Sequence, residues 1–144
     1  MSLFENQVIT EVVTPKNIKD LTGIKPSDYQ FNDTEEDPNV LLDELLEEWI
    51  TRIGSHVHSR LKRSITEEDD EYDAIRDIII RTVAKVVAVS QQQRTTPIVQ
   101  TSDFAVNILD TSEVIKGLRQ EIAPFKRRRI SVFSSIQDYE EEGS

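Results

Sequence analysis

The sequence predicts a mainly α protein, a small helical bundle built on a long antiparallel helix hairpin, with an extended or β-hairpin arm at about 98–109 and an extended carboxyl-terminal arm. Two long segments carry apolar residues every three or four positions, as amphipathic helices do. A short acidic turn separates them, so their apolar faces would meet and supply most of the core. At 144 residues the chain has the length of one ordinary domain.

A short helix is expected near the amino end. Thr14 and Pro15 form an N-cap and first-turn pair, and Gly23 is a typical helix stop. Within this segment Ile18 and Leu21 would face inward.

The first long helix should follow a polar loop at 25–38. Asp37 and Pro38 open it, and the apolar pattern continues to about Lys62. Acids fill its first half and bases its second half, and the terminal members of each group complement the helix dipole. Its apolar positions, with Trp49 expected in the core, are Leu42, Leu46, Trp49, Ile53, Val57 and Leu61.

The second long helix should cover about 74–94, after the acidic turn at 66–73. Its many β-branched residues would suit a strand, but the spacing of its charges decides for a helix. Asp77, Arg81 and Lys85 lie four apart, which places them on one polar stripe of a helix.

After Arg94 the pattern changes. Pro97 should stop the helix, and two apolar runs at 98–101 and 104–109 then suggest a hairpin or an extended arm. A last helix would begin at Thr111 or Ser112 and end before Pro124. The predicted organisation is a helical domain at 1–124, a docking arm at 125–136 and an acidic flexible tail at 137–144.

Composition narrows the classes of function. The net charge of -10 disfavours a protein that wraps its whole surface around DNA or an anionic membrane, and the chain has no cysteine. His56 and His58 lie two apart and would point to different sides of a helix, so we expect no metal site there. No glycine-rich phosphate loop or nucleophile motif is present, and we predict no enzyme activity, no cofactor, no membrane segment and no export signal.

The basic run at 126–129 is the most distinctive feature, because four consecutive cations precede a short apolar alternation in an acidic chain. One interpretation is a solvated linker. A second is a docking arm that adds as a strand to a partner while its cations pair with acidic groups. Contact with a DNA backbone is a third, although three glutamates at 140–142 argue against it.

Several stretches together resemble the head–tail adaptor proteins, also called connector or head-completion proteins, of tailed double-stranded DNA bacteriophages. They are "VVTPKNIKDLTGI", "LLDELLEEWITRIGSHVHSRL", "AIRDIIIRTVAKVVAVSQQQRTTPIVQ" and "LRQEIAPFKRRRISVF", and the resemblance spans roughly residues 12–133. It implies a small helical bundle with extended arms that assembles as a ring, typically of twelve copies, below the portal protein in the neck of the virion. The acidic end beyond Phe133 lies outside it.

The resemblance also implies partners: the portal protein, a tail completion or stopper protein, further copies of the chain, and double-stranded DNA that passes without sequence-specific binding. Such a subunit would be made in the host cytoplasm, and a negative lumen would repel the DNA. The alternative is a small acidic cytosolic regulator that binds one protein through the same arm. We expect the portal-docking arm to comprise Phe125, Lys126, Arg127, Arg128, Arg129, Ile130, Val132 and Phe133.

A second interface is expected at 98–109, because its apolar residues exceed what two helices can cover. It would face a neighbouring subunit or the next tail component. Its expected contacts are Ile98, Val99, Phe104, Val106 and Ile108.

Overall fold

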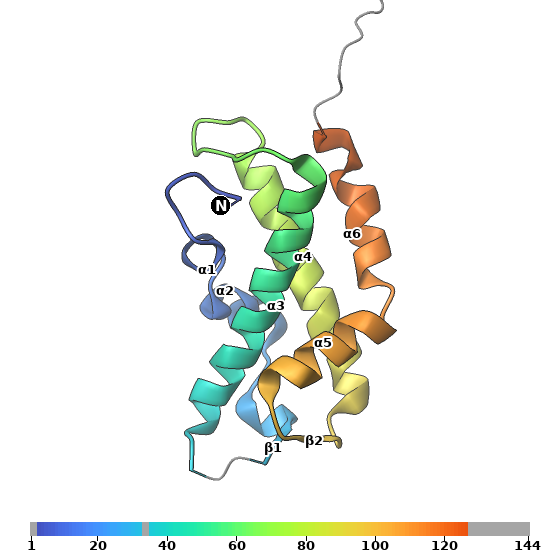
Figure 1. Ribbon diagram of the computed structural model, residues 1–144. Helices are drawn as coiled ribbons and strands as arrows, with labels where there is room; N and C mark the ends of the chain where they lie inside the picture. Colours follow the sequence, from blue (N-terminus) through green and yellow to red (C-terminus); the bar gives the residue numbers. More distant parts are fainter. Residues whose placement is uncertain (1–2, 33–34, 127–144) are drawn as a thin grey trace, which may run out of the picture.

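The computed structural model describes residues 3–32 and 35–126, and within them the chain forms a helical bundle with one very small sheet (Figure 1). The predicted fold class, a mainly α bundle, is confirmed. In chain order the elements are α1 (Ile9–Val12), α2 (Pro15–Thr22), the 3-10 turn η1 (Pro26–Asp28), β1 (Gln30–Phe31), α3 (Pro38–Leu61), α4 (Tyr72–Ser90), η2 (Gln91–Gln93), β2 (Pro97–Ile98), α5 (Thr101–Thr111), α6 (Val114–Ile122) and η3 (Ala123–Phe125).

The long antiparallel hairpin is formed by α3 and α4. The boundaries of α3 are those that the sequence predicts, whereas α4 begins at Tyr72 and ends at Ser90, earlier than the predicted 74–94, and η2 follows it. At the start of α3 the Asp37 side chain accepts a hydrogen bond of 2.9 Å from the backbone N–H of Asn39. The helix ends at Lys62, which adopts a left-handed conformation with φ 59°. Trp49 is fully buried, as predicted. Because α3 contacts α1, α2, α4, α5 and α6, it is the central helix of the bundle.

The short amino-terminal helix α2 is also confirmed. Thr14 caps it, accepting from the backbone N–H of Asn17 at 3.3 Å, and the Asn17 side chain accepts in return from the Thr14 N–H at 2.9 Å. Gly23 ends the helix at φ 72°, a conformation that glycine adopts without steric cost. The expectation for Leu21 is wrong, because this side chain is 56% exposed and only Ile18 is buried.

The prediction of an extended or hairpin arm at 98–109 is wrong, because most of this segment belongs to the helix α5. Its buried residues are Phe104, Ala105, Ile108 and Leu109, a spacing that places them on one face of a helix. The buried indole N–H of Trp49 donates to the Ala105 carbonyl at 3.2 Å, which fixes this face against α3.

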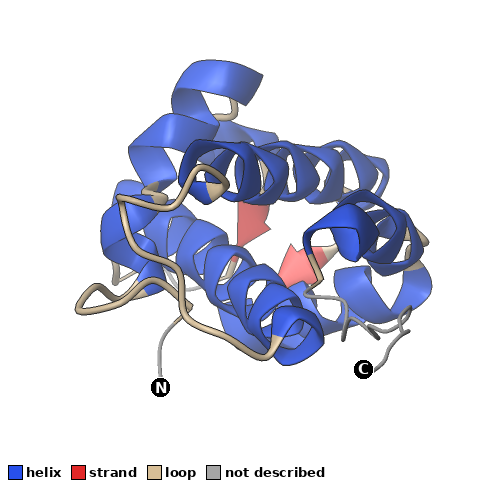
Figure 2. Ribbon diagram, turned by 90° about the horizontal axis from the view of Figure 1, so that it is seen from above, coloured by secondary structure: helices blue, strands red, loops and turns tan. Residues whose placement is uncertain are grey.

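Only the beginning of the segment is extended. There β2 pairs in parallel with β1, with Gln30 opposite Pro97 and Phe31 opposite Ile98. Viewed along the bundle, the two strands are seen between the surrounding helices (Figure 2). The sheet lies at the end of the bundle opposite to the carboxyl end of α6 (Figure 1).

The amino-terminal segment closes one side of the bundle. Phe4 is fully buried and meets the ring of Tyr72 edge to face, with the ring centroids 5.0 Å apart. α1 packs so closely on α3 that a Cβ atom on Gly54 would lie 2.9 Å from Cγ1 of Ile9. Only a glycine therefore fits at this crossing without displacing α1.

Candidate functional site

The predicted docking arm begins where the described chain ends. Phe125 closes η3 and is half-buried against the core, so it belongs to the folded body and not to a free arm. Lys126 is exposed. The other residues predicted for this arm, namely Arg127, Arg128, Arg129, Ile130, Val132 and Phe133, lie outside the described residues.

Arg63 holds the point from which this segment leaves the body. Its side chain is 11% exposed and pairs with Glu71 in the turn between α3 and α4. The same nitrogen, Nη2, donates to the backbone carbonyl of Phe125 at 3.0 Å. One guanidinium thus joins the end of α3, the turn into α4 and the end of η3. The chain beyond Lys126 therefore starts from a defined position at one end of the bundle.

The second predicted interface is mostly inside the subunit. Three of its residues, Ile98, Phe104 and Ile108, are only 3%, 8% and 1% exposed, so they are core residues that a partner does not reach. The physical reason is that α5 itself joins the core and covers the apolar residues that seemed to be in excess. Val106 is half-buried, and Val99 is 75% exposed.

Val99 lies beside a groove at the sheet end of the bundle. The groove has a volume of about 320 Å³ and is lined by apolar side chains together with two glutamates. The other exposed valine of this region, Val40, is 45% exposed in the first turn of α3. The lining residues are Phe31, Glu36, Leu41, Glu44, Ile98, Val99, Gln100, Thr101 and Ser102.

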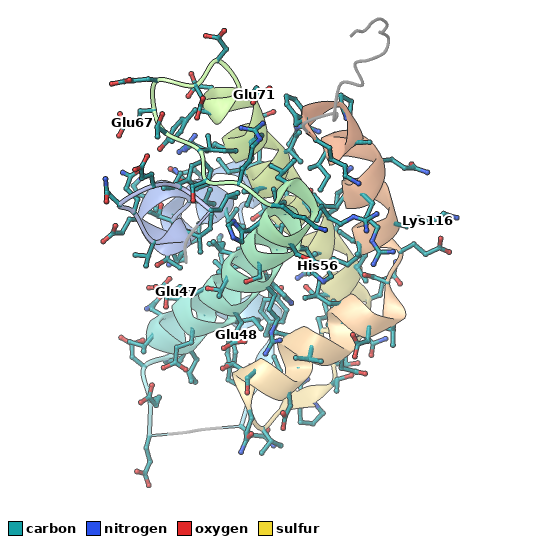
Figure 3. The ribbon with its side chains drawn as sticks, turned by 45° about the horizontal axis from the view of Figure 1, so that its top comes forward. Glu47, Glu48, His56, Glu67, Glu71 and Lys116 are labelled. Atoms are coloured by element: carbon teal, nitrogen blue, oxygen red, sulfur yellow. The ribbon has the colours of Figure 1, made fainter. Side chains whose placement is uncertain are left out.

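A second groove, between α3, α5 and α6, lies beside a group of basic side chains that the sequence analysis does not single out. Arg52, His56 and Arg60 lie four residues apart and form one stripe along α3. Burial lowers the pKa of His56, and the charges of Arg119 on α6 and of Arg60 lower it further, so these arginines lie near the imidazole. In Figure 3 His56 lies on the side of α3 that faces α6, while the exposed Lys116 projects from α6. We call Arg52, His56, Arg60 and Arg119 the cationic stripe.

The acidic runs of the sequence do not gather into a metal site within the described residues, because no group of three His, Asp or Glu side chains could hold an ion there. In the acidic turn Glu71 is paired with Arg63, and Asp69 accepts from the backbone N–H of Thr66 at 2.8 Å. The Thr66 and Asp69 pair therefore closes the turn, and α4 begins at Tyr72, three residues after Asp69.

Comparisons with known proteins identify no relative. No family model matches the chain, no curated protein matches it, and no solved structure matches it. Among the described residues, no helix is both long and apolar enough to cross a bilayer.

Proposed function

We propose that this protein is a head–tail adaptor of a tailed bacteriophage, a structural virion protein that forms a ring, typically of twelve copies, beneath the portal. The observation that carries the proposal is the origin of the basic and apolar segment. This segment leaves a small helical body at a point that Arg63 fixes through Glu71 and the Phe125 carbonyl. Because the Phe125 carbonyl is fixed, this segment would begin at the same position in every subunit of a ring.

The charge distribution supports the same proposal. Acidic residues outnumber basic ones by 27 to 17, and a predominantly negative ring would repel passing DNA and not retain it. The four consecutive cations at 126–129 are then available for acidic groups of the portal protein. In this function the subunit links the portal to a tail completion or stopper protein and acts without catalysis.

The test uses the full chain and the portal protein of the same virion, mixed and analysed by size-exclusion chromatography with light scattering. We expect co-elution of a ring with the portal. A chain that ends at Lys126 keeps Phe125 in its place on the body, and it should fold but no longer bind. A triple variant, Arg127→Ala, Arg128→Ala and Arg129→Ala, should bind more weakly than wild type.

The matched control removes three cations from other parts of the surface, as Lys16→Ala, Lys25→Ala and Arg94→Ala, and should bind as wild type does. If the intact full-length chain does not bind an intact portal, the adaptor proposal is wrong. A monomer or dimer that captures one other protein through the same segment would support the regulator alternative. Salt-dependent retention on duplex DNA would instead indicate phosphate contacts.

A further inference from the structure

Two arginines of the cationic stripe form no ion pair among the described residues. Arg60 and Arg119 are both exposed, and no carboxylate of the described chain lies within ion-pair distance of either. In contrast, Arg81 on α4 pairs with two carboxylates, Asp77 at 2.8 Å and Glu121 at 2.7 Å. Acids outnumber bases in this protein, so two neighbouring unpaired arginines are a local surplus of positive charge.

The groove beside these arginines has a surface that suits a short peptide. It has a volume of about 480 Å³, and Val106, Leu109 and Ile115 give it an apolar lining. Its own carboxylates are Glu48, which is paired with Arg52 at 3.1 Å, and Asp110. An occupant with carboxylates around one aromatic or apolar side chain would therefore match both the arginines and the lining.

The chain contains such a segment. Residues 138–142 read "DYEEE", with one tyrosine among four carboxylates. The connection to this segment begins close to the cationic stripe. Arg63 holds the Phe125 carbonyl and is only three residues from Arg60. Eleven residues lie between Lys126 and Asp138, and the twelve steps from one to the other span up to about 40 Å of extended chain. α6, along which the segment would return, has nine residues and is about 14 Å long.

We propose that the acidic segment 138–142 binds the groove between α3, α5 and α6 of its own chain, with its carboxylates on Arg60 and Arg119 and Tyr139 against the apolar lining. Exposed ion pairs contribute little, so this contact would be weak between separate molecules. A short connection within one chain gives an effective concentration on the order of millimolar, so the segment of the same chain has the advantage over that of a second copy at micromolar concentration.

A consequence for assembly rests on the proposed function, whereas the contact itself does not. While the acidic segment occupies the groove, the basic run at 127–129 is looped back beside the body of its own subunit. Portal binding would have to compete with this contact. A free subunit would thus be less ready to capture acidic surfaces than its sequence suggests.

The experiment uses paramagnetic relaxation in solution NMR. The chain has no cysteine, so Ser144→Cys provides one attachment site for a nitroxide label on the full-length protein. We expect the label to broaden the backbone amide signals around Arg60, Arg119 and Ile115. The broadening should disappear in 1 M NaCl, where the Debye length is about 3 Å.

Paired variants make the test specific. Arg60→Gln with Arg119→Gln should abolish the broadening, and the amide spectrum of this variant should show an intact fold because both side chains are exposed. The control, Lys25→Gln with Arg94→Gln, removes two exposed cations that precede η1 and β2 at the other end of the bundle and should leave the broadening unchanged.

Two results would overturn the proposal. One is the absence of broadening near the cationic stripe in the labelled wild type. The other concerns a mixture of ¹⁵N-labelled protein without a nitroxide and ¹⁴N protein that carries the nitroxide. If the broadening in this mixture equals that in the singly labelled ¹⁵N protein, the segment comes from a second copy. Neither result depends on portal binding, so failure of the adaptor proposal and failure of this contact are distinguishable.

Discussion

Gly54 provides the sharpest test of the packing, because the effect of one substitution should change sign with its background. In the middle of a helix, Gly→Ala normally stabilises by about 1 kcal/mol. Here the added Cβ would lie 2.9 Å from Cγ1 of Ile9, and overpacking of this kind costs about 1–3 kcal/mol. Taking about 2 kcal/mol for the overpacking, Gly54→Ala should lower the free energy of unfolding by about 1 kcal/mol.

In an Ile9→Ala background Cγ1 and Cδ1 of residue 9 are absent and its Cβ, 3.4 Å away, is an ordinary contact, so Gly54→Ala should instead raise the free energy of unfolding by about 1 kcal/mol. The coupling between the two positions is then about 2 kcal/mol. Urea unfolding can be followed by the fluorescence of Trp49, which is the single tryptophan and is fully buried. If Gly54→Ala has the same effect in both backgrounds, α1 does not pack on α3 as described.

Substitutions at three further positions test individual side chains by urea unfolding. Tyr29→Phe should cost about 1 kcal/mol, because the buried hydroxyl lies 2.6 Å from that of Ser90. Burial raises the pKa of Tyr29, so the wild-type protein should lose stability as pH rises above about 10, where the unfolded chain ionises first, and Tyr29→Phe should lose less. Asp37→Ala should cost about 1 kcal/mol by removing the acceptor for the Asn39 N–H, while Asp37→Ser should retain most of the stability. Trp49→Phe should cost about 2 kcal/mol, followed by circular dichroism, because a buried hydrogen bond to α5 and packing volume are both lost.

Local signals were sufficient to predict the helices whose ends are marked in the sequence. Thr14 and Gly23 bound α2, and Asp37 opens α3, each through a contact between residues close in the chain. A last helix that ends before Pro124 is also predicted; α6 ends at Ile122, although it begins at Val114 rather than at Thr111 or Ser112, and its residues Leu118 and Ile122 are buried. Such features need no knowledge of the tertiary fold.

The ends of α5 could not be predicted in the same way, because no local cap marks them, although the spacing of its buried residues fits a helix and could have indicated one. Its N-cap residue, Gln100, makes no side-chain capping hydrogen bond, and the segment begins just after Pro97. What holds the helix is its buried face and the hydrogen bond from Trp49 to Ala105, across 56 positions of the sequence. A pattern that alternates over a few residues cannot report a partner so far away.

The same limit applies to the candidate site. Arg52, His56 and Arg60 share one helical face, which their spacing of four could have indicated, but their proximity to Arg119 depends on how α6 packs on α3. The contact of Arg63 with the Phe125 carbonyl joins positions 62 residues apart and likewise has no local signature.

The two ends of the bundle carry different groups. At one end the chain continues beyond Lys126 beside Arg63, between the acidic turn at 66–73 and the unpaired Arg60 one turn away. At the other end the strands border a groove that combines apolar side chains with Glu36 and Glu44, next to the exposed Val99. A ring of subunits that all point the same way would repeat these ends as two unlike faces. Under the proposed function this difference is what an adaptor requires, because the portal and the tail completion protein are different partners and each would meet a surface of its own chemistry.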